Sequence, residues 1–307
     1  MKAKIAITKG DNRSQNIETA LRLIEKEICL KKKRGLLIKV NFVSTRNQLA
    51  ATHIDAMYPL LKFLRKRYDG KITIVESTLG AAAVGFEKYG YLGLVREFGV
   101  ELIDLNKGEW ELVDLYDSRL RPMKLHFAKQ VVNSDYRIVI GPAKTHDTVG
   151  VTLSLKNLAM GSLSYTHGDK IKMHQGYPVH NLNLYLLAKA YPPQLSIIDG
   201  FTGMEGNGPI SGNPVTWGVA VISCDPVAAD CLTAQMMGFN VSDIGYLWYC
   251  KRKGLGAGDI GDMDILGVNP KECYCKFKPH ITYEEQKHWR DKSISTVSYT
   301  HLTLPTN

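Results

Sequence analysis

Short apolar runs alternate with amphipathic segments along most of the chain. The runs typical of strands are, by residue number, 5–7, 36–43, 72–75, 100–105, 136–140, 195–198, 219–223 and 263–266. Apolar residues recur at helical spacing in the segments 16–30, 54–68 and 92–98. Because strands that are apolar along their whole length are covered on both faces, the pattern predicts an α/β fold with a mostly parallel sheet and helices on both of its faces.

Residues 109–133 depart from this alternation. Segments 110–115 and 123–127 are strand-like and flank a turn, which predicts a β-ribbon. We therefore expect a single α/β domain over 1–294, with 109–185 as a candidate inserted or capping lobe. The last residues, SYTHLTLPTN, resemble translated sequencing-adapter DNA, so we expect 295–307 not to belong to the native protein.

Charge and cysteine content narrow the classes of partner. The 307 residues carry a formal net charge of +9, which makes nucleic acid, an anionic membrane surface and an anionic small molecule candidate partners. The densest basic run, 31–34, has no interleaved aromatic residue, so a nucleic-acid partner is not expected.

The sequence predicts no membrane span, because no uncharged apolar run reaches about 18 residues. Six scattered cysteines without a CxxC pair predict reduced thiols, a cytoplasmic location and no iron–sulfur cluster within the chain.

Residues that directly follow the strands are the first candidates for a site. In open α/β sheets, ligands bind outside the carboxyl ends of the strands. The polar residues at these places are Asn41, Glu76, Ser77, Lys144, His146, Asp199 and Asp225.

The stretch GPAKTHDTVGVTLSLKNLAMG, residues 141–161, concentrates donors and cations after a strand. If a helix begins near Val149, then Thr148, Thr152 and Lys156 share one helix face, and the helix N-terminus favours an anion. A lysine that is merely solvated on a surface helix is the alternative. The prediction makes His146 and Lys156 catalytic and gives ligand binding to Lys144, Thr148, Thr152 and Asn157.

A second stretch, DGFTGMEGNGPISG at 199–212, is rich in glycine. Glycine allows positive φ or a close approach of the backbone to a ligand, although the spacing fits neither a dinucleotide fingerprint nor a Walker loop. Asp199 is predicted to be catalytic, and Gly203, Gly206 and Gly208 are predicted to bind a cofactor. The alternative is a glycine-rich turn in which Asp199 caps its own backbone.

Four histidines, at 146, 167, 174 and 180, lie within 35 positions. Their spacing excludes a zinc site on one helix, but separate loops could gather a metal site, because neutral imidazole binds several transition metals. His167, His174 and Glu205 are the predicted metal ligands. Surface or satisfied core histidines are the alternative. Asp230 falls among apolar residues, so we expect it to be buried with a partner, such as a lysine of the site.

Three ordered stretches resemble one protein family. They are AKTHDTVGVTLSLKN (143–157), DGFTGMEGNGP (199–209) and DPVAADCLTAQMMG (225–238), and they resemble the domain of unknown function 362 family over about 35–268. Many members of that family are called iron–sulfur proteins because they carry a ferredoxin-like cysteine module. Here Cys273 and Cys275 do not complete a four-cysteine set, so the departure argues against a cluster in this chain.

A more distant resemblance is to the lactate racemase family. Members of that family have a histidine that is separated by nine residues from a lysine, and a further histidine lies downstream. The lysine anchors a nickel-pincer nucleotide, and the later histidine binds the metal. His146 and Lys156 have this spacing, and His167 or His174 would be the later ligand. The family has a glycine pair before its lysine, where this chain reads LSL.

Two functions follow from these observations. The first is an enzyme that binds an anionic small molecule or cofactor at the strand ends and carries out proton transfer or isomerisation. The second is a non-catalytic, iron–sulfur-associated redox accessory that docks a ferredoxin-like partner. A histidine with a perturbed pKa in a closed pocket favours the first, and exposed histidines on a flat basic face favour the second.

Overall fold

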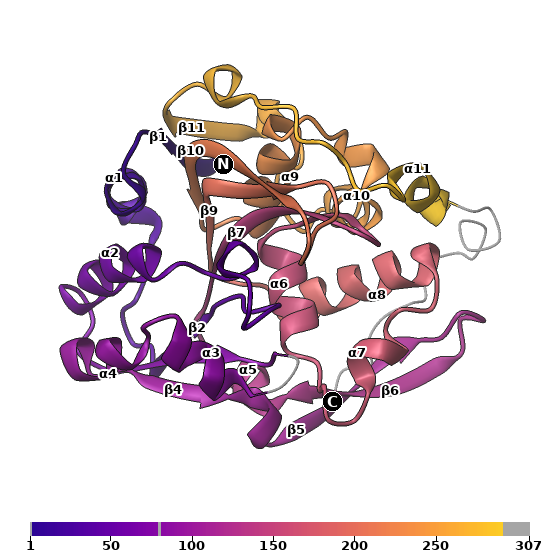
Figure 1. Cartoon of the computed structure of the whole chain (residues 1–307), viewed down its shortest axis with the longest axis horizontal. Helices are drawn as coiled ribbons and strands as arrows, with labels where there is room; N and C mark the ends of the chain where they lie inside the picture. The colour runs from indigo at the N-terminus through magenta and orange to yellow at the C-terminus, as the bar shows by residue number, and fades with distance from the viewer. Residues whose placement is uncertain (1, 79–80, 291–307) are drawn as a thin grey trace.

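A nine-stranded sheet forms the centre of the molecule (Figure 1). The computed structural model describes residues 2–78 and 81–290, so the predicted non-native tail lies outside the described residues. The strand order is β11 (Met263–Gly267), β1 (Ala3–Lys9), β10 (Asn213–Ser223), β9 (Leu195–Glu205), β7 (Arg137–His146), β2 (Gly35–Lys39), β3 (Lys71–Glu76) and β4 (Glu101–Asp104), with β8 (Gly150–Thr152) paired to β7.

The sheet is mostly parallel, as the apolar strand runs predict. The pairs β11–β1, β9–β7, β7–β2, β2–β3 and β3–β4 are parallel. Strand β10 runs antiparallel to both of its neighbours. The predicted α/β fold class is therefore confirmed.

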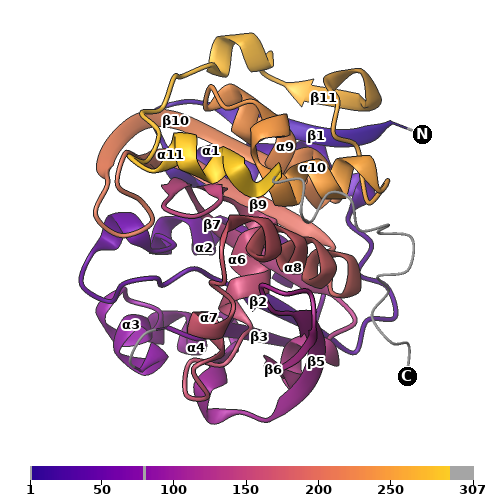
Figure 2. The same ribbon diagram turned by 90° about the vertical axis from the view of Figure 1, so that its right-hand side faces the viewer.

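Helices cover both faces of the sheet. Successive strand residues point to opposite faces, so Ile138 and Val139 belong to two different apolar clusters. One face carries α1 (Arg13–Leu23), α2 (Ile54–Arg65), α3 (Ala82–Lys88) and α4 (Leu92–Phe98). The other carries α6 (Ser154–Gly161), α8 (Tyr177–Ala190), α9 (Pro226–Met236) and α10 (Gly245–Arg252), and Figure 2 shows α6 and α8 side by side there.

The predicted ribbon is present as a separate two-stranded sheet. Strands β5 (Trp110–Tyr116) and β6 (Pro122–Ala128) pair antiparallel beside α8. Short helices α5 (Lys129–Val132), α7 (Asp169–Lys172) and α11 (Tyr283–Gln286) complete the fold. The limits of the domain and of the inserted lobe stay predictions.

Two helix predictions need correction. Helix α1 ends at Leu23 rather than near residue 30, and only a 3-10 turn follows it. No helix begins at Val149: β7 continues to His146, turns, and pairs antiparallel with β8. Gly150 adopts a φ of +72°, and the β-branched residues around it favour a strand, so the VGVT segment forms a hairpin arm. Helix α6 starts only at Ser154.

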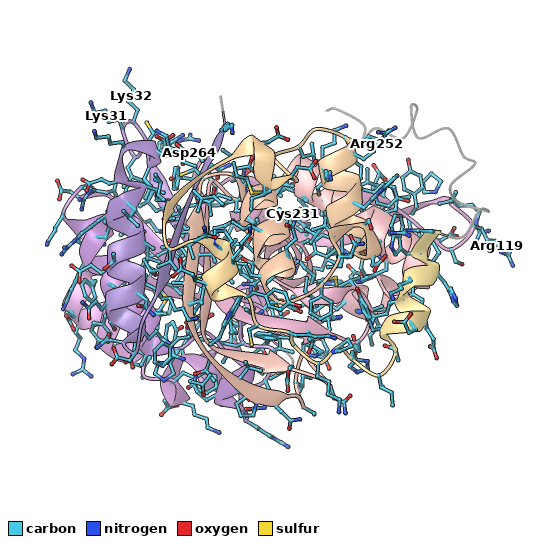
Figure 3. All side chains as sticks on the ribbon, turned by 90° about the horizontal axis from the view of Figure 1, so that it is seen from above. Lys31, Lys32, Arg119, Cys231, Arg252 and Asp264 are labelled. Carbon is cyan, nitrogen blue, oxygen red and sulfur yellow. The ribbon has the colours of Figure 1, made fainter. Side chains whose placement is uncertain are left out.

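The basic run at 31–34 follows α1. Lys31 and Lys32 are exposed and point outward from the molecule (Figure 3). No helix in the described part of the chain is long and apolar enough to cross a membrane.

Candidate functional site

A cavity of about 360 Å³ lies where β2, β3 and β7 end, alongside α6. Its lining combines strand-end residues with residues of α6, α7 and the β9–β10 loop. The polar lining residues are Lys39, Asn41, Glu76, Ser77, Thr78, His146, Asp147, Thr152, Lys156, Asn157, Lys170 and His174. The apolar and remaining lining residues are Phe42, Val43, Met160, Gly161, Tyr165, Ile171, Pro209 and Ile210.

The predicted pair of His146 and Lys156 meets in this cavity. Lys156 Nζ lies 2.5 Å from His146 Nε2, and both side chains are buried. Burial lowers the pKa of Lys156 to about 7, because the charged form loses its hydration, and the nearby Asp147 opposes this shift only in part. Lys156 therefore exchanges its proton near neutral pH.

The other imidazole nitrogen faces two partners that require different tautomers. His146 Nδ1 lies 2.9 Å from Asp147 Oδ1 and 3.1 Å from the Thr148 amide nitrogen. When Nδ1 carries the proton it donates to Asp147, and Nε2 then accepts from the Lys156 ammonium. When Nδ1 instead accepts from the Thr148 amide, Nε2 donates to a neutral Lys156 amine. The tautomer of His146 is thereby coupled to the charge of Lys156.

His146 itself stays neutral around pH 7. Burial lowers its pKa to about 3, and the positive charge of Lys156 acts in the same direction. Burial alone would raise the pKa of Asp147, but hydrogen bonds from His146 and Thr148 lower it, so Asp147 stays ionised.

The β7–β8 hairpin holds this histidine in place through the C-terminal region. Gln286 Nε2 donates to the His146 carbonyl at 2.9 Å, and Gln286 Oε1 accepts from the Gly150 amide at 2.5 Å. Thr282 Oγ1 donates to the Asp147 carbonyl at 2.8 Å. These bonds tie both arms of the hairpin to the segment around α11.

A second buried lysine is fully paired. Lys39 Nζ lies 2.7 Å from Glu76 Oε1 and also donates to the Val40 carbonyl at 2.6 Å. Gly161 of α6 makes room for it, since a Cβ there would lie 2.3 Å from Lys39 Cε. Lys39 and Glu76 thus form a compensated pair in the cavity wall.

Lys170 supplies a further cation to the cavity. Its Nζ donates to the Ser77 carbonyl, and burial lowers its pKa to about 8. Within residues 2–78 and 81–290, neither Lys156 nor Lys170 forms an ion pair with a carboxylate. Three lysines and two carboxylates line the cavity, so it holds one positive charge in excess when all are ionised.

Three residues of the lining have a buried polar atom without a hydrogen-bond partner among the described residues. They are Thr78 Oγ1, Thr152 Oγ1 and Asn157 Nδ2. Buried polar atoms are normally satisfied, so their clustering around one cavity indicates a place for a polar ligand. Thr152 and Asn157 were predicted to bind ligand, and both line the cavity.

Several predicted site residues lie outside this cavity. Asp199 pairs with Arg13, with Asp199 Oδ2 3.0 Å from Arg13 Nε, and accepts from the Phe201 amide at 3.1 Å, as the capping alternative holds. Lys144 is fully buried beside the cavity and donates to Asn41 Oδ1 at 2.6 Å. Thr148 is a turn residue that supports Asp147.

The glycines at 203, 206 and 208 also do not line the cavity. A Cβ at Gly203 would lie 2.7 Å from the Phe277 ring, and one at Gly208 would lie 2.2 Å from the Thr145 carbonyl oxygen. Gly206 has a φ of +71°. These glycines allow tight packing and a turn, and their cofactor-binding role stays a prediction. The loop they shape places Pro209 and Ile210 on the cavity.

The predicted metal ligands do not come together. His174 lines the cavity, where its ring stacks on His180. His167 lies apart from it, stacked on His126, and Glu205 accepts from the Lys278 amide at 2.7 Å. In the described part of the chain, no group of three or more His, Cys, Asp or Glu side chains could hold a metal ion.

The N-terminus of α6 is occupied by a carboxylate of the protein itself. Asp230 accepts from the amides of Ser154 and Leu155, each at 2.9 Å, and from Ser154 Oγ at 2.5 Å. The predicted anion site at this helix end is therefore filled, and the partner of Asp230 is a helix end rather than a lysine. Burial raises the pKa of Asp230 to about 7, against these hydrogen bonds.

Sequence reasoning missed two lysines of the cavity. Lys39 interrupts the apolar run LLIKV, and a charged residue within a buried strand was a signal for a paired site residue. Lys170 lies in a polar stretch, and no local pattern marks it. Asn41, Glu76 and Ser77, which the strand-end argument selected, line the cavity.

These features define an α/β protein with a lysine-lined cavity at the carboxyl ends of parallel strands. Residues 36–235 match the family described as Domain of unknown function (DUF362), and the chain belongs to this family. The resemblance drawn from the three sequence stretches is confirmed.

Two individual proteins are similar to this chain. Thylakoid-associated protein sll1697 of Synechocystis sp. (strain ATCC 27184 / PCC 6803 / Kazusa) is 27% identical over 178 residues, which cover 57% of this chain and 54% of that protein. The chain thus spans about half the length of this curated relative. The lactate racemase apoprotein from Thermoanaerobacterium thermosaccharolyticum has a TM-score of 0.51 at 14% identity, covering 77% of this chain and 57% of that one. This second likeness concerns the fold.

Proposed function

We propose that the protein is an enzyme that binds an organic anion in the cavity and transfers a proton through Lys156. One observation carries the proposal: a buried lysine with a pKa of about 7 contacts a neutral imidazole inside a cavity. A general base is most effective when its pKa lies near the working pH. Lysine is almost never fully buried unless it is paired, and Lys156 has no carboxylate in ion-pair contact among the described residues.

The Lys170 ammonium supplies the charge that attracts the anion, and Lys156, with a pKa of about 7, is present in charged and neutral forms near pH 7. An ionised donor makes shorter and stronger hydrogen bonds than a neutral one, and Lys170 has no carboxylate contact among the described residues. Thr78, Thr152 and Asn157 offer further polar atoms to the ligand.

The two lysines divide the proton transfer between them. Neutral Lys156 amine takes a proton from the carbon next to the ligand's carboxylate and becomes an ammonium. The Lys170 ammonium, whose pKa of about 8 keeps it protonated at pH 7, returns a proton to that carbon. His146, held by Asp147, adjusts its tautomer to the charge of Lys156. The result is inversion at that carbon without net loss of a proton from the ligand, and the starting state returns when Lys156 gives its proton to water and Lys170 takes one up.

A metal-bearing nucleotide on Lys156 is a further implication of the lactate racemase resemblance. Lys156 and His174 line one cavity, as that arrangement requires. However, Lys156 already contacts His146, and the described residues offer no metal-binding cluster of three side chains. The residues do not fit this group well, so no step proposed here depends on it. A metal ion, a ferredoxin-like partner and a cytoplasmic location stay predictions.

Proton transfer is tested by exchange in heavy water. Purified protein is incubated in D₂O with a panel of 2-hydroxy, 2-amino and unsubstituted carboxylates, and loss of the α-proton signal is followed by NMR. We expect exchange with the parent protein and with a Lys253→Met control, which removes an exposed lysine. Lys156→Met and Lys156→Arg should lose it, because guanidinium stays protonated. Anion binding without exchange in any of these proteins would refute proton transfer through Lys156 and leave a role in binding.

A further inference from the structure

Exposed apolar side chains surround the solvent end of the cavity. Tyr165 is 37% exposed, Ile171 is 72% exposed and Ile210 is 38% exposed, and all three line the same cavity as Lys156. They come from two distant segments, the α6–α8 connection and the β9–β10 loop. We call these three residues the apolar rim.

The inner end of the cavity has the opposite character. Lys39, Glu76 and Lys156 are at most 7% exposed. The cavity therefore changes from charged and buried inside to apolar and exposed at its mouth. Exposed apolar side chains gathered around an opening mark a binding site rather than ordinary surface.

One short helix supplies both characters. In α7, Lys170 reaches inward to the Ser77 carbonyl, while the next residue, Ile171, belongs to the rim. The preceding Asp169 is fully buried and fixes the helix by accepting from the His126 amide at 2.6 Å and from Lys172 Nζ at 2.9 Å. Helix α7 thus fixes the position of the Lys170 ammonium relative to the Ile171 side chain before a ligand binds.

We propose that the ligand is an amphiphilic carboxylate, with its charged head at Lys156 and Lys170 and an apolar body against the rim. This inference rests on the proposed function and names the substrate class for that site. A singly charged head balances the one excess positive charge of the lining. A volume of about 360 Å³ is at the small end of ligand pockets, which suits a body of one ring or a short branched chain.

Three small probes separate the head from the body. Ligand-observed NMR titrations compare 3-phenylpropanoate, propanoate and the neutral 3-phenylpropanamide. Because the ring buries apolar surface, 3-phenylpropanoate should bind about tenfold or more tightly than propanoate. The amide should bind more weakly than the matching acid, since it carries no charge for the lysines.

Matched variants locate the effect. Ile171→Ser should weaken binding of 3-phenylpropanoate by about three- to tenfold and leave propanoate unchanged. Ile171 is exposed, so its replacement does not threaten the fold. Ile281→Ser serves as the control, because Ile281 is 86% exposed and lies outside the cavity lining, and it should change neither affinity.

The outcomes distinguish this inference from the proposed function. If both acids bind equally well and Lys156→Met abolishes both, the anion site stands and the amphiphilic substrate class is overturned. The class is also overturned if Ile171→Ser and Ile281→Ser have equal effects. If neither acid binds, or the amide binds as tightly as its acid, the anion site itself falls, and the inference falls with it.

Discussion

Replacement of Lys156 by methionine is expected to stabilise the protein while it removes anion binding. The side chain is 7% exposed and has His146 as its close polar contact. Methionine fills a similar volume and carries no charge that must leave water. A site built for a ligand is expected to be less stable than its apolar counterpart.

The size of the effect follows from the pKa of this lysine. Its pKa of about 7 in place of 10.5 means that the buried ammonium costs the folded state roughly 4 kcal/mol at pH 7. Loss of the hydrogen bond to His146 reduces this gain in the stability of the variant by about 1–2 kcal/mol. The free energy of unfolding of Lys156→Met should therefore exceed that of the parent by about 2 kcal/mol.

The pH dependence has a defined sign. Between pH 7 and 10.5 the unfolded chain holds more protons at this lysine than the folded protein does, so the parent gains stability as the pH rises. Lys156→Met lacks this lysine. Its advantage should be greatest at pH 7 and below, shrink as the pH rises, disappear at about pH 9–10, where the cost of the ammonium has fallen to that of the lost hydrogen bond, and reverse above this pH.

Lys39→Met is the matched control in the same cavity. Lys39 is also buried, but its removal leaves Glu76 without the cation that lies 2.7 Å away. Breaking a buried pair in this way costs about 3–5 kcal/mol, so Lys39→Met should destabilise the protein. Urea denaturation of the parent and both variants at pH 7 and 9 measures the two effects. A Lys156→Met protein less stable than the parent at pH 7 would refute the reasoning, because Lys156 would then be a structural cation.

Three further substitutions test other parts of the structure. Gly161→Ala should destabilise by about 1–3 kcal/mol, since the new methyl group collides with Lys39, and chemical denaturation measures this; unchanged stability would contradict the tight contact. Gln286→Ala should cost about 1–3 kcal/mol by unpairing the His146 carbonyl and a hairpin amide, and amide hydrogen exchange should speed up in β7 and β8; unaltered exchange would show that the C-terminal segment does not support the site. The folded parent keeps Asp230 protonated up to about pH 7, whereas the unfolded chain loses this proton near pH 4, so the parent loses stability as the pH rises from about 4 to 7. Asp230→Asn should lack this pH-dependent loss. Denaturation across this range measures it, and the same slope in parent and variant would contradict the argument.

The strand-end rule selected several residues that the structure brings together at one cavity. Asn41, Glu76, Ser77 and His146 follow three different strands and line one cavity, because parallel strands end at the same edge of the sheet. The same rule also selected Asp199, which directly follows the apolar run 195–198 but lies within β9 and pairs with Arg13. The position of Asp199 along its strand does not reveal that Arg13 of α1 forms an ion pair with it.

Local periodicity predicted the wrong secondary structure for 148–153, where the backbone forms a turn and a strand before α6. The spacing of Thr148, Thr152 and Lys156 fits one helix face, yet the residues lie on a turn, a strand and a helix. Lys156 still reaches the cavity because the hairpin and α6 both pack at the end of β7. The contribution of Lys170 depends on the placement of α7 across the fold, and no short-range pattern contains that information.

The protonation of Lys156 tests the central claim most directly. Protein with ¹³Cε-labelled lysine is titrated by NMR, with the Lys156 signal assigned by its absence from Lys156→Arg, both alone and with saturating 3-phenylpropanoate. We predict a pKa of about 7 in the free protein, as burial dictates, and a higher pKa with the bound carboxylate, because an adjacent negative charge favours the ammonium. A pKa at the ordinary lysine value in the free protein, with no response to the carboxylate, would contradict the account.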